Sequence, residues 1–126
     1  MRFLLDTNIL IRFLANDAAV VEQLNIWRDN LVLLSISTIT VAEILAQPSL
    51  TGQEQIIIRG FLDDFLIIPV DTLVAEKTAE LRRANKISLG DSIITATAIY
   101  TQSVLVTNDK PLIKNVSNLV KVQSIN

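Results

Sequence analysis

The sequence contains no cysteine and no histidine. The absence of cysteine excludes disulfide bonds and thiolate metal sites. The absence of histidine removes the side chain that most often acts as a general base, and with it a preferred ligand for zinc and copper. Any metal site in this chain must therefore use oxygen ligands, above all carboxylates.

Glycine and proline are also scarce, with three of each among 126 residues, and they occur singly. No linker or low-complexity tract divides the chain, so we expect a single domain over residues 1–126. No apolar run approaches the roughly 18 residues that span a bilayer. The N-terminal apolar segment meets Asp6 too soon to form a signal peptide, which predicts a cytoplasmic protein.

Hydrophobic residues make up 50% of the chain but aromatic residues only 5%, so Ile, Leu, Val and Ala must build the core. Such a core is typical of a parallel α/β fold. The mean hydropathy of +0.45 is high for so small a domain, which predicts apolar surface left for a partner. The net charge of −2 means that any contact with nucleic acid must use a local basic patch.

The hydrophobic pattern predicts strands that alternate with helices. We expect strands at residues 2–5, 31–35, 66–70, 103–107 and 119–122. We expect helices at residues 8–14, 18–29, 37–47, 52–65, 71–85 and 89–102, and a short helical turn near 111–114. This alternation predicts a three-layer α/β/α sandwich, in which helices cover both faces of a parallel sheet.

Two short aliphatic runs, at residues 3–5 and 104–106, are each followed by an acidic residue. Asp6 comes directly after the first run, and Asp109 ends the sequence Thr107-Asn108-Asp109 after the second. Open α/β sheets bind ligands at the carboxyl ends of their strands, where both acids should lie. Each acid alone is explained equally well as a helix cap or a turn residue.

Two further acids stand in predicted helices. Glu43 lies in a helix that is otherwise apolar, and burying a lone carboxylate costs several kcal/mol or more, so we expect it to be paired, metal-bound or at the floor of a cleft. A salt bridge to a distant arginine is the alternative. Asp91 fits a reciprocal capping box with Ser88, which is the better interpretation of that acid taken alone.

Four carboxylates at one sheet edge would raise each other's pKa, and a divalent cation would relieve that conflict. An all-oxygen ligand set selects Mg²⁺ or Mn²⁺. Because Mg²⁺ keeps waters and shares its coordination shell with phosphate oxygens, this site indicates hydrolysis of phosphodiester bonds.

These motifs together resemble the PIN-domain nucleases, and most closely the VapC-type toxins of bacterial toxin–antitoxin pairs. The resemblance spans nearly the whole chain and rests on Asp6-Thr7-Asn8, Glu43, residues 90–98 and Thr107-Asn108-Asp109. It implies a five-stranded parallel sheet and a Mg²⁺- or Mn²⁺-dependent endoribonuclease that acts on single-stranded RNA. It also names two candidate partners, an antitoxin and a second copy of the chain.

Carried over by position, Asp6, Glu43, Asp91 and Asp109 would form the catalytic site, and the three aspartates among them would bind the metal. Thr107 and Asn8 would support that site. Many relatives have a further acid and a phenylalanine where this chain has Pro111-Leu112, which weakens the expectation of a tightly bound second metal. The basic residues nearest the acids in sequence are candidates for RNA binding: Arg82, Arg83, Lys86 and Lys110.

Three other interpretations compete. A haloacid-dehalogenase-like phosphatase needs an acid two residues after Asp6, where this chain has Asn8. A phospho-acceptor signalling domain needs an acidic pair near the first strand, which is missing. An interaction domain that keeps the PIN scaffold and only binds RNA or a protein stays open because of Pro111, although the intact acids argue against it.

Overall fold

The computed structural model describes residues 1–126 and contains one five-stranded parallel sheet in the order β3-β2-β1-β4-β5. The strands are β1 (Arg2–Leu5), β2 (Leu33–Ser37), β3 (Leu66–Ile68), β4 (Val104–Val106) and β5 (Val122–Gln123). From β1 the chain first builds outward through β2 to β3 and later places β4 on the other side of β1. The gap between β1 and β4 is therefore a topological switch point, where open α/β sheets bind their ligands.

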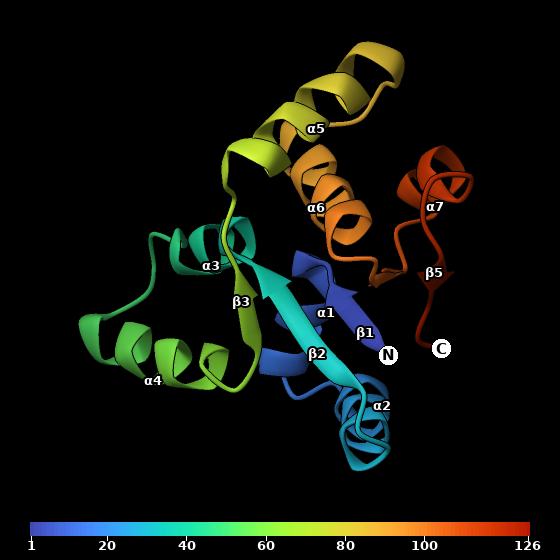
Figure 1. The fold of residues 1–126 in the computed structure, drawn as a ribbon. Helices are drawn as coiled ribbons and strands as arrows, with labels where there is room; N and C mark the ends of the chain where they lie inside the picture. The colour runs from blue at the N-terminus through green and yellow to red at the C-terminus, as the bar shows by residue number, and fades with distance from the viewer.

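Seven helices connect the strands, which confirms the predicted α/β fold. They are α1 (Thr7–Leu14), α2 (Ala18–Asp29), α3 (Thr38–Leu45), α4 (Gly52–Leu62), α5 (Thr72–Ala84), α6 (Leu89–Tyr100) and α7 (Lys110–Val116). Figure 1 shows the hairpin of α5 and α6 on one side of the sheet, with α2 and α4 on the other. None of these helices combines the length and apolar character needed to cross a membrane.

The alternation of side chains along β1 explains the three layers, because successive residues of a strand point to opposite faces. Phe3 and Leu5 join the core cluster that includes Leu24 of α2, whereas Leu4 joins a second cluster with Ile94 of α6 and Leu105 of β4. Both faces of β1 are thus buried. The strand is buried up to its end, where Asp6 follows. The Asp6 carboxylate therefore lies at the buried edge of the sheet.

Four strands differ from their predicted limits: β3 ends two residues early, β4 is one residue shorter at each end, and β2 and β5 are shifted along the chain. β2 begins two residues later than expected because Leu31 adopts a left-handed φ of 62° in the turn after α2. The strand instead continues through Ile36 and Ser37. Within it, the hydroxyl of buried Ser35 donates to the Phe3 carbonyl at 3.0 Å, so a satisfied polar residue lies inside the sheet. The segment expected as the last strand continues the turn after α7, since the N–H groups of Leu119 and Val120 both donate to the Val116 carbonyl.

Candidate active site

Asp6 and Asp109 lie where β1 and β4 lead into helices, on the two sides of the switch point. Asp6 is the N-cap of α1, and its Oδ1 accepts the Ile9 N–H at 2.8 Å. Asp109 is the N-cap of α7, and its Oδ1 accepts the Leu112 N–H at 3.1 Å. Each cap uses one carboxylate oxygen, which leaves the other oxygen available for a second role.

Asp91 lies in the first turn of α6, but its carboxylate does not complete the predicted capping box. Ser88 is the N-cap and accepts the Asp91 N–H at 3.2 Å, whereas the Ser88 N–H makes no hydrogen bond to the Asp91 carboxylate. In α4 the corresponding pair, Thr51 and Glu54, forms both halves of the box. The reciprocal interpretation of Asp91 was therefore wrong, and its carboxylate is not needed to cap the helix.

Glu43 is exposed, which corrects the expectation that an apolar helix would bury it. The apolar neighbours of Glu43 cover the core from the other side of α3, so this face of the helix opens to the site. No ion pair involves Glu43, which excludes the alternative of a distant arginine. Its Oε1 accepts the Thr7 hydroxyl at 2.6 Å, and its Oε2 lies 3.5 Å from where a side chain on Gly90 would begin. Glu43 thus reaches from the start of α1 to the residue before Asp91.

The environment of Asp6 disfavours its charged form. Burial raises the pKa of Asp6, whose exposed fraction is only 4%. The Thr107 hydroxyl and the Ile9 N–H oppose this shift of the pKa, and the charges of Asp91 and Asp109 add to it. The three aspartates therefore act on one another electrostatically although they come from separate parts of the chain.

Asp91 is linked to the same group of acids. Burial raises its pKa, the Ser88 hydroxyl lowers it, and the nearby charges of Asp109 and Glu43 raise it again. All four predicted acids are thus connected through these interactions. Carboxylates with raised pKa values and no neutralising partner, at the switch point of an α/β sheet, are an arrangement often found at functional sites.

The acids have no neutralising partner within the chain. The ion pairs of the structure all lie elsewhere and join Arg12 to Asp17, Arg59 to Asp63, and Lys77 to Glu80. No group of three acidic side chains comes close enough to hold a metal ion by itself. This arrangement fits Mg²⁺ or a similar hard cation, which binds through one or two carboxylates and keeps several of its waters. It does not fit a dehydrated cage of protein ligands.

The predicted supporting residues differ in their placement. Thr107 is fully buried beside Asp6, and its hydroxyl also accepts the Asp109 N–H at 3.1 Å, so it bridges the two strand ends. Asn8 is exposed in the first turn of α1, and its side chain makes no hydrogen bond. Thr107 therefore occupies a supporting position, and a role for Asn8 stays a prediction.

The predicted RNA-binding residues are all exposed, but they lie in two places. Lys110 follows Asp109 directly, as the first residue of α7. Arg82, Arg83 and Lys86 lie at the end of α5 and in the turn to α6. Lys110 is therefore the basic residue nearest to the acidic group along the chain.

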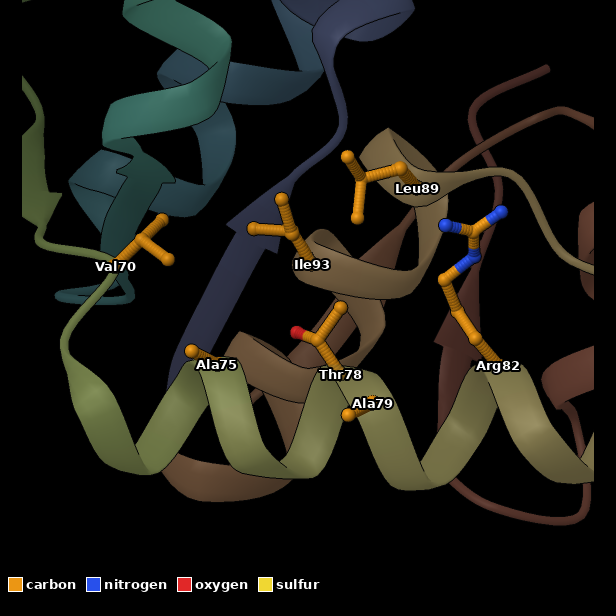
Figure 2. Close-up of a pocket in the computed structure, with 7 residues that line it drawn as sticks. All are labelled: Val70, Ala75, Thr78, Ala79, Arg82, Leu89 and Ile93. Carbon is orange, nitrogen blue, oxygen red and sulfur yellow. The ribbon is translucent and has the colours of Figure 1, made fainter.

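An apolar pocket of about 360 Å³ lies between α5 and α6, separate from the acids. Figure 2 shows Leu89 and Ile93 of α6 on its upper side and Arg82 rising from α5 toward Leu89. Leu89 and Ile93 are one helical turn apart, whereas Asp91 projects about 160° to 200° away around the same helix. The helix α6 therefore separates this pocket from the carboxylates.

Three polar residues near the site were not predicted. The hydroxyls of Thr7 and Thr40 lie 3.0 Å apart beside Glu43. Asn108 holds the end of the chain, since its side-chain amide donates to the Ile125 carbonyl and accepts the Ile125 N–H at 2.8 Å. Thr7 and Asn108 lie inside the sequence motifs that contain the acids, and this position could have identified them as site residues. Nothing in the sequence singled out Thr40 for its contact with Thr7.

Comparison with known proteins identifies the family. The PIN domain family model matches residues 3–118. The chain belongs to the PIN domain family. The prediction from the sequence motifs is thereby confirmed, and PIN-domain nucleases generally use divalent metal ions. No curated protein sequence gives a significant match.

Solved structures agree with this assignment. A toxin–antitoxin complex from Klebsiella pneumoniae is 29% identical, with a TM-score of 0.79 over 95% of this chain and 94% of that chain. FitAcB from Neisseria gonorrhoeae is also 29% identical, with a TM-score of 0.70 over 95% of both chains. A DNA-bound VapBC from Salmonella typhimurium shares the fold at 21% identity, with a TM-score of 0.78 over 98% of both chains.

Proposed function

We propose that this PIN-domain protein is a Mg²⁺- or Mn²⁺-dependent endoribonuclease that cuts single-stranded RNA and acts as the toxin of a toxin–antitoxin pair. The observation that carries this proposal is the group of four acids at the β1/β4 switch point, none of which takes part in an ion pair. The raised pKa values of Asp6 and Asp91, to which the charges of Asp109 and Glu43 contribute, support it. An RNA substrate also favours a cytoplasmic site of action.

The four acids would have different roles in the reaction. Asp6, Asp91 and Asp109 would hold the cation, one or two of them directly and the remainder through its waters. Asp6 and Asp109 would use the oxygens that their helix caps leave free, and Asp91 a carboxylate that capping does not need. A bound divalent cation supplies positive charge for the phosphate and a water of lowered pKa. The free oxygen of Glu43 would accept the proton of the attacking water, whose oxygen joins phosphorus as the P–O3′ bond breaks. The leaving 3′-oxygen would take up a proton from solvent water. The products would carry 5′-phosphate and 3′-hydroxyl ends.

The basic residues would bind the RNA backbone outside the reacting phosphate. Lys110 is the best placed, because it is exposed and adjacent to Asp109 at the start of α7. Arg82, Arg83 and Lys86 form a second basic group at the α5–α6 turn. With a net charge of −2, the protein must attract RNA through such local groups.

Apolar surface on the first four helices supports an antitoxin partner. A groove of about 190 Å³ between α1, α3 and α4 is lined by Ile11, Ile44 and Ile58 among others. On α4 only Leu62 is buried, while Ile56 remains 75% exposed. We infer that an amphipathic segment of the antitoxin covers this groove, and that a second copy of the chain forms a homodimer through another surface. The mass of the purified complex in solution, measured by light scattering, tests both parts: a stable monomer with no bound antitoxin contradicts them.

The test of the enzymatic proposal uses protein freed from any antitoxin and a 5′-labelled single-stranded RNA. We expect cleavage with Mg²⁺ or Mn²⁺, no cleavage with a chelator, and recovery when metal is returned. Calorimetric titration should show metal binding by wild type and its loss in Asp6→Asn. Asp71→Asn should bind as wild type does, because Asp71 is a helix cap whose charge does not act on Asp6 or Asp91. Equal metal affinity in wild type and Asp6→Asn contradicts the assigned site.

The alternative function is a PIN-fold domain that binds RNA or a protein without cutting. The same assays separate it from the proposal. Failure of the metal-loaded protein to cleave any of several unrelated RNAs, combined with retained binding to them, would favour the alternative.

A further inference from the structure

Glu43 is the least constrained of the four acids. It is exposed and has a long flexible side chain, whereas Asp6 and Asp109 are each fixed by a helix cap. A carboxylate that must act at one point in a site cannot be left to sample many rotamers. Something in the protein has to hold it in place.

The only hydrogen bond to the Glu43 carboxylate comes from Thr7. The two oxygens are 2.6 Å apart, the short distance typical of a hydroxyl that donates to a charged carboxylate. Thr7 is the first residue of α1 and β-branched, so its own side chain has little rotational freedom. Its position directly after Asp6 links the placement of Glu43 to the end of β1.

The Glu43 carboxylate fixes the direction of both hydrogen bonds that join it to Thr7 and Thr40. A hydroxyl has a single proton, and an ionised carboxylate can only accept, so Thr7 gives its proton to Glu43. The Thr40 hydroxyl, 3.0 Å from that of Thr7, must then donate to it. Thr40 is fully buried and lies one turn before Glu43 on α3, so the chain Thr40→Thr7→Glu43 is anchored in the core.

This chain of two hydrogen bonds, from Thr40 to Thr7 and from Thr7 to Glu43, is called the relay below. The relay also selects which oxygen of Glu43 faces the site. Thr7 engages Oε1, and Oε2 lies 3.5 Å from the position of a Cβ on Gly90, next to Asp91. The carboxylate is therefore held between the residue after Asp6 and the residue before Asp91. Only Oε2 remains free of the relay.

We propose that Thr7, held by the buried Thr40 hydroxyl, is a positioning residue that fixes the Glu43 carboxylate for the reaction and leaves its Oε2 free to act. This inference rests on the proposed ribonuclease function. Thr7 touches neither the RNA nor the cation and acts only through Glu43. The relay therefore assigns a role to the threonine of the Asp6-Thr7-Asn8 motif that differs from the role of its aspartate.

The test compares Thr7→Val with Thr7→Ser under saturating Mg²⁺. Thr7→Val keeps the shape but removes the proton donor, and we expect kcat to fall roughly 10- to 100-fold with little change in KM, the loss that corresponds to a charge-assisted hydrogen bond. Thr7→Ser restores the donor and should recover most of kcat. As a matched control, Thr78→Val removes a buried hydroxyl that only donates to the Val74 carbonyl of its own helix, and it should leave kcat unchanged.

A double-mutant cycle shows whether Thr7 acts through Glu43. In a Glu43→Gln background the residual rate should be the same with Thr7 or Val at position 7, because the charged acceptor is already gone. An equal loss in both backgrounds overturns the proposal and makes Thr7 a structural residue. Unchanged kcat in Thr7→Val overturns it as well.

A crystal structure of Thr7→Val provides a readout that does not depend on cleavage. We expect the Glu43 carboxylate to leave its place beside Gly90, and an unmoved carboxylate contradicts the relay. If wild type itself cuts no RNA, the proposed function fails, but this structural comparison still decides whether Thr7 positions Glu43.

Discussion

Replacing Asp6 by Asn should abolish the activity and yet stabilise the metal-free protein. The Asp6 carboxylate is 4% exposed, and burial together with the charges of Asp91 and Asp109 raises its pKa, so its ionised form is unfavourable in the folded chain. Asn keeps an Oδ1 for the Ile9 N–H, so the cap of α1 survives. The substitution removes a charge but leaves the local structure in place.

The gain in stability follows from opposing terms. Relief of burial and like-charge repulsion contributes on the order of 1–2 kcal/mol for a partly screened group. Loss of the favourable interaction between a negative charge and the helix N-terminus costs about 0.3–1 kcal/mol. The net effect should be a stabilisation of about 1 kcal/mol, which corresponds to a rise in Tm of about 4 °C for a domain of this size.

The stability difference between wild type and Asp6→Asn should depend on pH in a defined direction. Because its pKa is raised, Asp6 keeps its proton to higher pH in the folded chain than in the unfolded chain, where the ordinary value is 3.8. The penalty is therefore absent below that value and develops as the pH rises through the raised pKa. Wild type and Asp6→Asn should differ in Tm near neutral pH and converge in acid.

The assay is thermal unfolding in the presence of a chelator, from acidic to neutral pH. Asp71→Asn is the matched control, since Asp71 caps α5 in the same way, with its Oδ1 accepting the Val74 N–H at 2.9 Å. Asp71 is exposed, and its charge does not act on Asp6 or Asp91. Its Tm should stay equal to that of wild type or fall slightly. A Tm of Asp6→Asn at or below that of wild type at neutral pH would refute the electrostatic reasoning.

Two further predictions concern other parts of the molecule. Lys110→Gln should raise KM for RNA with little change in kcat, because the lysine is exposed beside Asp109 and is expected to contact phosphate. The slope of log KM against log salt concentration should also fall by about one unit. An unchanged salt dependence excludes that contact. Leu31→Asn should stabilise the protein by about 0.5–1 kcal/mol in chemical denaturation, because Leu31 has a φ of 62° that Asn tolerates better. Leu31 is 90% exposed, so little packing is lost, and a destabilised variant would show that its side chain contributes more than its backbone strain costs.

The fold could be predicted because its signals are local. Apolar runs such as residues 3–5 and 104–106 fix buried parallel strands, and the helices expected to begin at residues 18 and 71 begin at Ala18 and, after the cap at Asp71, at Thr72. The limits of β2 could not be predicted, because a single left-handed residue in the preceding turn moved the strand on to Ile36 and Ser37. The hydroxyl of buried Ser35 is satisfied by the Phe3 carbonyl, a hydrogen bond that forms only in the assembled sheet.

The candidate site, too, could be predicted only in part from the sequence. Its four acids could be found because a charge next to a buried strand or within an apolar helix demands an explanation. The exposure of Glu43 could not be predicted, because it depends on which face of α3 points at the core. The contact between Thr40 and Thr7 was equally hidden, since it joins two ordinary polar residues 33 positions apart. Sequence patterns therefore locate the charges, and tertiary packing decides how they are held.

The most direct test of the central claim is cleavage of single-stranded RNA by Asp91→Asn. Asn preserves the backbone N–H that donates to the Ser88 hydroxyl, so α6 should keep its cap and the Tm should not fall. If Asp91 contributes its charge to a metal-dependent site, the variant should show no cleavage with Mg²⁺ or Mn²⁺ under conditions in which wild type cuts. Undiminished cleavage by Asp91→Asn would contradict the assignment of this acid and of the site built around it.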